Sequence, residues 1–205
     1  MAKIIKHLKD FIGIHKDSKI IVCGCGISLL DFKEHAHKYI TIGVNDVPIL
    51  FTPTYLLVTD SPRRFGGKRK DRVNKAESKY LFTCAAGWRH PNLVHFKLED
   101  NSKNDVTSPD KICHFVHSPY VAVGLAARLG AKHIGLIGVD FTKGHFYNKN
   151  DGEHPVIKMN YLKKVNSVYS KMQIALNNTG TQIYNLSSIS KIELPKITLS
   201  AFDNL

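Results

Sequence analysis

The sequence KIIVCGCGISLL, residues 19–30, decides the fold of this chain. A short β-branched apolar run at residues 20–22 is typical of a strand buried on both faces of a sheet. The run leads into Gly24 and Gly26, and apolar residues that begin a helix follow. A strand, a glycine-bearing turn and a helix form the first part of a βαβ unit.

The glycine turn has the chemistry of an anion site. Gly24 and Gly26 let the backbone approach a ligand closely, and the free N–H groups of the following helix favour a phosphate. The dinucleotide fingerprint requires a third glycine where this chain has Leu29, so the turn does not predict a standard NAD site. A tight connection is the alternative interpretation of the turn, and a helix cap is the alternative role of Ser28.

Two further strands are predicted at residues 39–44 and 55–59, and polar residues follow each of them. Asn45 and Asp46 follow the first of these strands, and Asp60 follows the second. Because ligands of open α/β sheets lie beyond the carboxyl ends of the strands, we expect these side chains to share an edge with the glycine turn. Ordinary turn chemistry is the alternative explanation for Asn45 and Asp46.

The rest of the chain alternates between predicted strands and helices. Pro119 and Gly130 flank a helix of small residues, which suits close packing on a sheet. Polar residues 99–110 read as a surface loop. Further strands are predicted at residues 80–83, 93–96, 133–137 and 182–184, and helices at residues 120–129 and 160–178. This alternation predicts an α/β fold, a Rossmann-like three-layer domain with a mostly parallel sheet, and a single domain over residues 1–205.

A basic segment at residues 62–78 is predicted to form a glycine-hinged loop. Such a loop has three interpretations: a mobile lid over an anionic substrate, a solvated loop, or a nucleic-acid patch. Phe65 is its only phenylalanine, which weighs against binding of single strands by base stacking. Its positive residues are Arg63, Arg64, Lys68, Arg69, Lys70, Arg72, Lys75.

Composition limits the class of protein and of partner. The net charge of +12 predicts attraction to nucleotides, nucleic acid or other anionic partners, with nucleic acid not favoured. No apolar run approaches the roughly 20 residues of a membrane span. Residues 1–17 predict an amphipathic helix that covers a sheet edge, with membrane-surface binding as the alternative, and no secretory signal.

The cysteines do not form a disulfide framework, which favours a cytoplasmic location. Cys23 and Cys84 follow apolar strands and read as small core residues. Cys113, His114 and His117 have the spacing of half a zinc site, but no second half follows.

Four segments resemble, in the same order, one superfamily of proteins. They are GCGISL at 24–29, IGVND at 42–46, SPYVAVGLAARLGAKHIGLIGVDF at 118–141 and NLSS at 185–188. The superfamily contains the bacterial sialyltransferases, the motility-accessory glycosyltransferase-like proteins and the archaeal hydroxymethylpterin diphosphokinase-like proteins. The chain looks most like the small bacterial and phage-borne members of this group.

The resemblance implies a nucleotide site and a catalytic loop. Residues 142–158 correspond to the loop that supplies the reaction chemistry, with Tyr147 as a phosphate contact and His154 as general base, a role for which His145 competes. The positions that correspond to nucleotide contacts are Gly24, Gly26, Ser28, Asn45, Asn185, Ser187, Ser188. Asp46, Asp60, Ser118 and Asp140, at predicted strand ends and a helix start, complete the predicted nucleotide-binding set.

Three functions follow, and they differ in chemistry. Transfer of a sugar from a CMP-sialic-acid-like donor needs a histidine base and charge stabilisation by Tyr147, Ser118 and the basic segment, without a cofactor. A diphosphokinase of the hydroxymethylpterin type would hold Mg²⁺ on carboxylates such as Asp60 and Asp140. The third function is non-catalytic binding of a nucleotide or nucleic acid.

Overall fold

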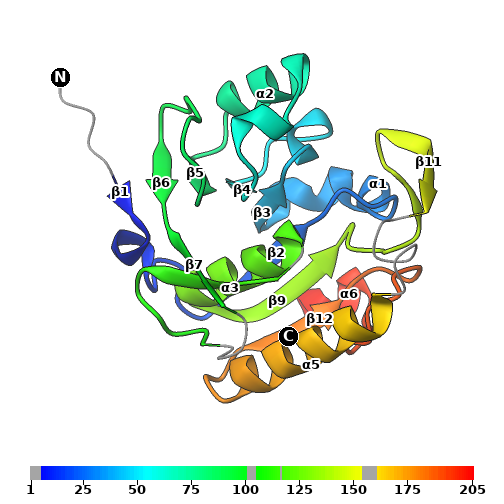
Figure 1. Cartoon of the computed structure of the whole chain (residues 1–205). Helices are drawn as coiled ribbons and strands as arrows, with labels where there is room; N and C mark the ends of the chain where they lie inside the picture. The colour runs from blue at the N-terminus through cyan, green and yellow to red at the C-terminus, as the bar shows by residue number, and fades with distance from the viewer. Residues whose placement is uncertain (1–5, 101–104, 116, 154–160) are drawn as a thin grey trace.

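An eight-stranded parallel sheet forms the centre of the computed structural model (Figure 1). Its strand order is β1 (Lys6–His7), β6 (Leu93–His95), β5 (Tyr80–Thr83), β4 (Tyr55–Val58), β3 (Ile40–Val44), β2 (Ser18–Cys23), β9 (Ala131–Ile137), β12 (Gln182–Asn185). The chain runs outward from β2 to β6, then returns to place β9 and β12 on the other side of β2. The structure describes residues 6–100, 105–115, 117–153 and 161–205, with residues 149–153 by their backbone.

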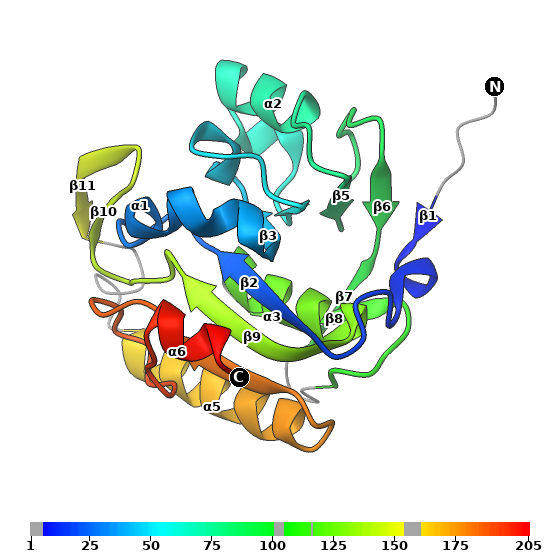
Figure 2. The ribbon, with the colours of Figure 1, turned by 180° about the vertical axis from the view of Figure 1, so that it is seen from behind.

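Helices cover both faces of this sheet, which confirms the predicted three-layer Rossmann-like fold (Figures 1 and 2). Side chains of β2 alternate between the two layers, because successive residues of a strand point to opposite faces. Ile20 and Val22 pack in the core that holds α3 (Ser118–Leu129) and α5 (Leu162–Asn177). Ile21 and Cys23 pack in the opposite core, with α1 (Leu29–Phe32) and α6 (Leu199–Asp203).

Helix α3 lies against the middle of the sheet with most of its residues buried. A Cβ at Gly124 would lie 2.6 Å from Cγ2 of Ile112, so the helix needs this glycine to pack closely. Gly130, at φ +98°, ends the helix in the left-handed conformation. Near that end the buried Arg128 donates hydrogen bonds to the carbonyl oxygens of Gly124, Asp105 and Ser108, at 2.8, 3.1 and 2.9 Å.

The amphipathic N-terminal helix predicted over residues 1–17 is wrong for its described part. Residues 6 and 7 form β1, η1 (Leu8–Phe11) is a 3₁₀ helix, and turns lead from there to β2. The apolar residues of this segment pack against the sheet instead: the Phe11 ring contacts Tyr80 and Phe82 edge-on. Gly13, at φ +71°, turns the chain away from a helical path.

The prediction of a basic loop over residues 62–78 is also wrong. Helix α2 (Gly67–Asn74) occupies its centre, and η4 (Pro62–Arg64) precedes it. Phe65 and Val73 anchor the segment in a third apolar cluster, with Trp88 and side chains of β4 and β5. Val73 is the one buried side chain of α2. The sequence therefore lacks the repeated apolar residues by which an amphipathic helix is recognised.

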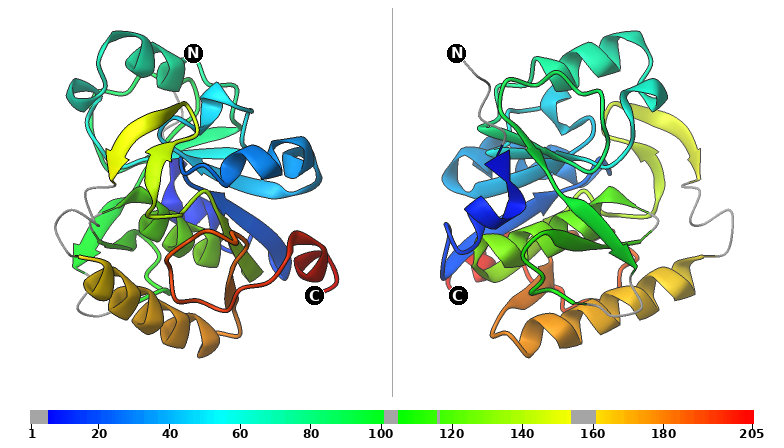
Figure 3. Two further views of the ribbon diagram at one scale, coloured as in Figure 1. Left: turned by 90° about the vertical axis from the view of Figure 1, so that its right-hand side faces the viewer. Right: turned by 60° about the vertical axis from the view of Figure 1, so that its left-hand side comes forward.

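Two small sheets were not predicted. β7 (Lys97–Asp100) pairs in parallel with β8 (Lys111–His114), so the predicted surface loop over residues 99–110 begins as a strand. β10 (Lys143–His145) and β11 (Asn148–Glu153) form an antiparallel hairpin within the predicted loop at residues 142–158. The hairpin lies next to α2 beyond the carboxyl ends of the central strands (Figure 3).

Short 3₁₀ segments connect the remaining elements, namely η2 (Lys33–Lys38) after α1 and η3 (Val47–Ile49) after β3. Within the described ranges, no helix is long and apolar enough to cross a membrane.

Replacing Gly24 by alanine is expected to lower the free energy of unfolding by about 3 kcal/mol. The added Cβ would lie 2.3 Å from the carbonyl oxygen of Gly138, so the ends of β2 and β9 would have to separate. Urea denaturation measures the change. Gly66→Ala is the matched control, because its Cβ meets nothing within 4 Å. Gly66 is the N-cap of α2, where alanine is less favourable than glycine, so its stability should fall by no more than about 1 kcal/mol. Equal effects of the two substitutions would contradict the close packing at Gly24.

Candidate functional site

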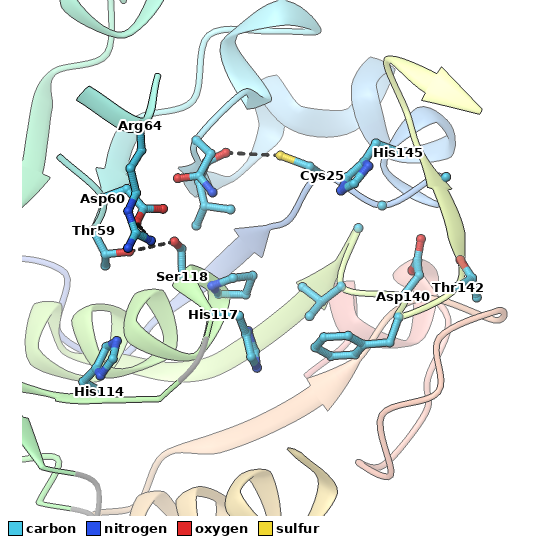
Figure 4. A pocket seen from close by; sticks show the side chains of 18 residues that line it. Cys25, Thr59, Asp60, Arg64, His114, His117, Ser118, Asp140, Thr142 and His145 are labelled. Atoms are coloured by element: carbon cyan, nitrogen blue, oxygen red, sulfur yellow. Dashed lines mark hydrogen bonds and ion pairs between the residues drawn. The ribbon is translucent and has the colours of Figure 1, made fainter. Parts of the chain in front are cut away.

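A cavity of about 530 Å³ lies over the carboxyl ends of β2, β3, β4 and β9, at the N-terminus of α3 (Figure 4). This is the edge at which doubly wound sheets bind ligands, beside the point where the strand order reverses. Its volume is that of a small-molecule site. The residues that line it include Cys25, Gly26, Asn45, Thr59, Asp60, Arg64, His117, Ser118, Asp140, His145.

The glycine turn forms one wall of the cavity, but packing within the protein accounts for its glycines. Gly24 N–H donates to the carbonyl of Ile137 at 2.8 Å, and Gly26 N–H donates to that of Gly138 at 2.7 Å. A Cβ at Gly26 would lie 2.4 Å from Oδ2 of Asp140. The turn is therefore a tight connection, and Gly26 lines the cavity while Gly24 lies behind it.

The side chains of Ser28 and Ser187 both donate hydrogen bonds to Asp140, and these bonds join the ends of three strands. The buried Asp140 carboxylate accepts hydrogen bonds from Ser28 N–H at 2.9 Å, Ser28 Oγ at 2.6 Å and Ser187 Oγ at 2.8 Å. Ser28 Oγ in turn accepts from Gly138 N–H at 2.9 Å, and it makes no helix-capping bond. These three predicted nucleotide-binding residues hold the turn, β9 and the segment after β12 together.

Two further predicted residues, Asn185 at the end of β12 and Ser188 after it, are not among the residues that line the cavity. Asn185 is buried; its Nδ2 donates to the carbonyl of Ile192 at 3.1 Å, and its Oδ1 accepts from Ser187 N–H at 3.0 Å. Ser188 is exposed. Nucleotide contacts by these residues stay predictions.

Asn45 and Asp46 are neighbours in the sequence, but Asn45 faces the cavity whereas Asp46 is buried against two arginines. Asn45 adopts φ +51°, which asparagine tolerates better than most residues, and it lines the cavity. Its buried Oδ1 has no hydrogen-bond partner among the described residues. Asp46 is buried beside it, and its carboxylate accepts from Arg69 Nε at 3.0 Å and from Arg72 at 3.3 Å. A second N–H of Arg69 also donates to it.

The bonds from Arg69 and Arg72 to Asp46 fix α2 at the rim of the cavity. Hydrogen bonding to Asp46 raises the pKa of Arg69, whose guanidinium also lies over the Phe65 ring, 4.4 Å from its centroid. Cys25 lies close by, where its thiol donates to the carbonyl of Val44 at 3.5 Å. Burial raises the pKa of this thiol to about 12, so Cys25 is no nucleophile at neutral pH.

One end of the cavity gathers hydroxyl groups and a cation. Oγ1 of Thr59 and Oγ of Ser118 lie 3.0 Å apart, at the end of β4 and the start of α3. Arg64 donates to Asp60 at 3.0 Å on the same side (Figure 4). Ser118 and Asp60 were predicted for this site, whereas Thr59 and Arg64 were not assigned individually. Their positions in the sequence could have identified them, because Thr59 and Arg64 each lie within a few residues of the end of a strand or helix.

Histidines line the cavity from two directions. The predicted His145 contributes from the β10–β11 hairpin, with its ring stacked on Tyr147 at 5.1 Å between centroids. Tyr147 itself is exposed and is not among the lining residues. The predicted base His154 lies outside the described residues. His117 was considered only for zinc, yet it lines the cavity and stacks on Tyr169 at 5.5 Å.

Among the described residues, the carboxylates and cysteines considered for Mg²⁺ or Zn²⁺ do not lie together. Asp60 and Asp140 lie on opposite sides of the cavity (Figure 4), and each carboxylate has partners within the protein. The thiol of Cys113 donates to the carbonyl of Asp105, at 3.0 Å. Over the described ranges, no three histidine, cysteine or acidic side chains converge as metal ligands.

Asp140→Asn is expected to lower the free energy of unfolding by about 2–3 kcal/mol. The amide replaces one carboxylate oxygen by a donor, which faces donors from Ser28 or Ser187. Chemical denaturation measures the effect. Asp60→Asn, which removes an exposed pair with Arg64, should cost no more than about 1 kcal/mol. An unchanged stability of Asp140→Asn would show that the buried cluster does not hold the strand ends together.

Comparisons with known proteins support the fold. No family model and no curated protein matches the sequence. Among solved structures, the chain is similar to the MAf glycosyltransferase from Magnetospirillum magneticum AMB-1, with a TM-score of 0.57 and 12% identity. That match covers 97% of this chain and 37% of the other. The chain is also similar to the sialyltransferase CstII from Campylobacter jejuni, solved with the substrate analogue cytidine-5'-monophosphate, with a TM-score of 0.44 and 16% identity.

The match to CstII covers 87% of this chain and 85% of the other. At such low identities a likeness shows the fold alone, and this chain spans about 37% of the length of the MAf protein. The Rossmann-like α/β fold is thus shared with a glycosyltransferase.

Proposed function

We propose that this chain is a glycosyltransferase that binds a nucleotide-activated sugar, of the CMP-sialic-acid type, in the cavity at the carboxyl edge of the sheet. The observation that carries the proposal is Asn45 Oδ1, a buried acceptor without a hydrogen-bond partner among the described residues, in the wall of a cavity of ligand size. A buried polar atom of this kind is costly unless a ligand or water binds it. An amino or hydroxyl group of a nucleoside would satisfy it.

The shared fold with a glycosyltransferase agrees with this chemistry but does not decide it, because one fold carries many functions. The residues of the cavity are the stronger support. They offer acceptors, hydroxyls and a cation, but no cluster of carboxylates over the described part of the chain.

The phosphate of the donor is proposed to bind at the end of the cavity that holds Arg64, Thr59 and Ser118. In the transfer, the bond between the anomeric carbon and the phosphate oxygen breaks, and negative charge grows on the leaving nucleotide. A guanidinium and the positive end of α3 stabilise that charge. Arg64 has five N–H donors, of which one bonds to Asp60, so others are available to a phosphate.

The acceptor hydroxyl attacks the anomeric carbon and gives its proton to a general base. Histidine titrates near neutral pH and suits this step. We propose His154 for this role, with His145 as the competing base because it lines the cavity on the hairpin. Tyr147, which stacks on His145, is proposed as a phosphate contact when the hairpin lies over the donor.

Nucleotide binding tests the site directly. CMP, CDP, UDP, GDP and ATP are compared by thermal shift, each with and without Mg²⁺, because a ligand of the folded state raises the melting temperature. We expect stabilisation by CMP that does not require Mg²⁺. Affinity should be about tenfold weaker in Asn45→Gly, which removes the acceptor and tolerates the positive φ of this position. Asn177→Ala, an exposed position at the end of α5, should bind as the unchanged chain does.

Two outcomes would contradict the proposal. Stabilisation by ATP only with Mg²⁺ would favour the diphosphokinase function. Absence of stabilisation by every nucleotide would remove the proposed nucleotide site.

The base is identified by hydrolysis of CMP-sialic acid. Changing the histidine that acts as base to glutamine should lower the rate of hydrolysis by about 10²–10⁴-fold, while the affinity for CMP is retained. His154→Gln and His145→Gln are compared with His35→Gln, an exposed histidine on η2. Equal rates in all three variants would exclude both proposed bases.

A further inference from the structure

Asn45, the cavity residue on which the proposed function rests, has a backbone conformation that its neighbours must hold. It adopts φ +51°, a left-handed conformation that is unfavourable for residues other than glycine. Strain of this kind persists only where the surrounding structure fixes it. The direction of the side chain, and with it the position of the buried Oδ1 atom, therefore depends on the contacts made on either side of Asn45.

The contacts before Asn45 come from the sheet and from the glycine turn. Val44 is the last residue of β3, and its carbonyl oxygen accepts a hydrogen bond from the Cys25 thiol at 3.5 Å (Figure 4). The N–H of Asn45 donates to the carbonyl oxygen of Leu57, in β4, at 3.2 Å. The peptide group between Val44 and Asn45 is therefore held at both its C=O and its N–H.

The contact after Asn45 comes from α2. The side chain of Asp46 is 3% exposed, and its carboxylate accepts hydrogen bonds from Arg69 Nε at 3.0 Å and from Arg72 at 3.3 Å. A second N–H of Arg69 donates to the same carboxylate. A guanidinium that donates two N–H groups to one carboxylate fixes direction as well as distance. Because Asp46 directly follows Asn45, these bonds limit rotation of the backbone between the two residues.

Anchoring of α2 is the weaker explanation for this ion pair. Phe65 and Val73 already hold the α2 segment on the third apolar cluster, with Trp88. Burial of a carboxylate costs desolvation free energy that its partners often offset only in part, so a buried ion pair is poor evidence of a stabilising role. In several proteins such groups select one conformation instead. The conformation next to Asp46 is that of Asn45.

We propose that Arg69 and Arg72 are positioning residues of the donor site, which act through Asp46 to hold Asn45 with its Oδ1 atom in the cavity wall. The inference rests on the proposed function, in which Asn45 binds the nucleotide-activated sugar. No described residue of α2 lines the cavity, so both arginines act on the ligand through Asp46 and Asn45. Two arginines of the basic segment thereby gain a role in recognition that does not require them to touch an anion.

Substitutions of Arg69 separate geometry from charge. Arg69→Lys keeps the positive charge but loses the planar fork that binds both carboxylate oxygens. We expect the affinity for CMP, measured by isothermal titration calorimetry below the melting temperature of every variant, to fall about three- to fivefold in Arg69→Lys and in Arg69→Gln. A residue that acts through Asn45 cannot cost more affinity than Asn45→Gly itself.

The matched control is Lys68→Gln, which removes one exposed positive charge from the same helix. Its affinity for CMP should stay within about twofold of the unchanged chain, because an exposed charge is screened by solvent and salt. Unchanged affinity in Arg69→Lys, or an equal loss in Lys68→Gln and Arg69→Gln, would mean that the charge of α2 matters and its geometry does not. Either result would overturn the proposal.

A double-mutant cycle distinguishes positioning from a general loss of structure. Arg69→Gln is combined with Asn45→Gly, which lacks the side chain that Arg69 is proposed to position. If Arg69 acts through Asn45, the added Arg69→Gln should change the affinity for CMP by less than about twofold in this background. If the losses of the two single variants instead multiply, Arg69 acts by another route and the proposal fails.

The side-chain amide of Asn45 gives a readout that needs no ligand. Its signal in a proton–nitrogen NMR spectrum of the CMP-free chain is assigned by its absence in Asn45→Gly. We expect this signal to shift in Arg69→Gln and to keep its position in Lys68→Gln. A signal that does not move in Arg69→Gln would overturn the positioning role. If CMP does not bind the unchanged chain, the proposed function fails, and the Asn45 signal still decides whether Arg69 positions this side chain.

Discussion

The close contact between the ends of β2 and β9 determines the geometry of everything around it. Gly24 and Gly138 approach so closely that neither position has room for a Cβ. Just beyond this contact, Asp140 accepts hydrogen bonds from the turn after β2 and from the segment after β12. Three strand ends are thereby fixed at the point where the sheet reverses its order, and the cavity forms in front of them.

The sequence predicts the central strands and α3 well because burial on both faces leaves a continuous apolar signal. Ile20–Val22 needs no tertiary information to be recognised as a buried strand. The N-terminal segment and α2 were predicted wrongly for the opposite reason. The helical spacing of apolar residues before Gly13 reflects contacts with Tyr80 and Phe82, and α2 has one buried residue and depends on Asp46, which is distant in the sequence.

The candidate site was predicted at the level of the sheet edge, and less well at the level of single side chains. Asn45 and Asp46 carry the same signal in the sequence, yet one lines the cavity and the other is buried by two arginines. The positive φ of Asn45 separates them, and a backbone angle of that kind has no marker in an isolated sequence. Ser28 and Ser187 were predicted as nucleotide contacts from the resemblance to the superfamily. The structure adds what the sequence does not reveal, namely that both hydroxyls donate to the buried Asp140 carboxylate.

Arg128 has a consequence for how the site can move. Its hydrogen bonds to the carbonyl oxygens of Asp105 and Ser108 tie the C-terminal end of α3 to the segment around residues 105–108. The N-terminal end of the same helix lines the cavity. Helix α3 is thus anchored along its length and acts as a rigid floor. The N-terminal end of α3 therefore gives the cavity a wall whose position the fold fixes.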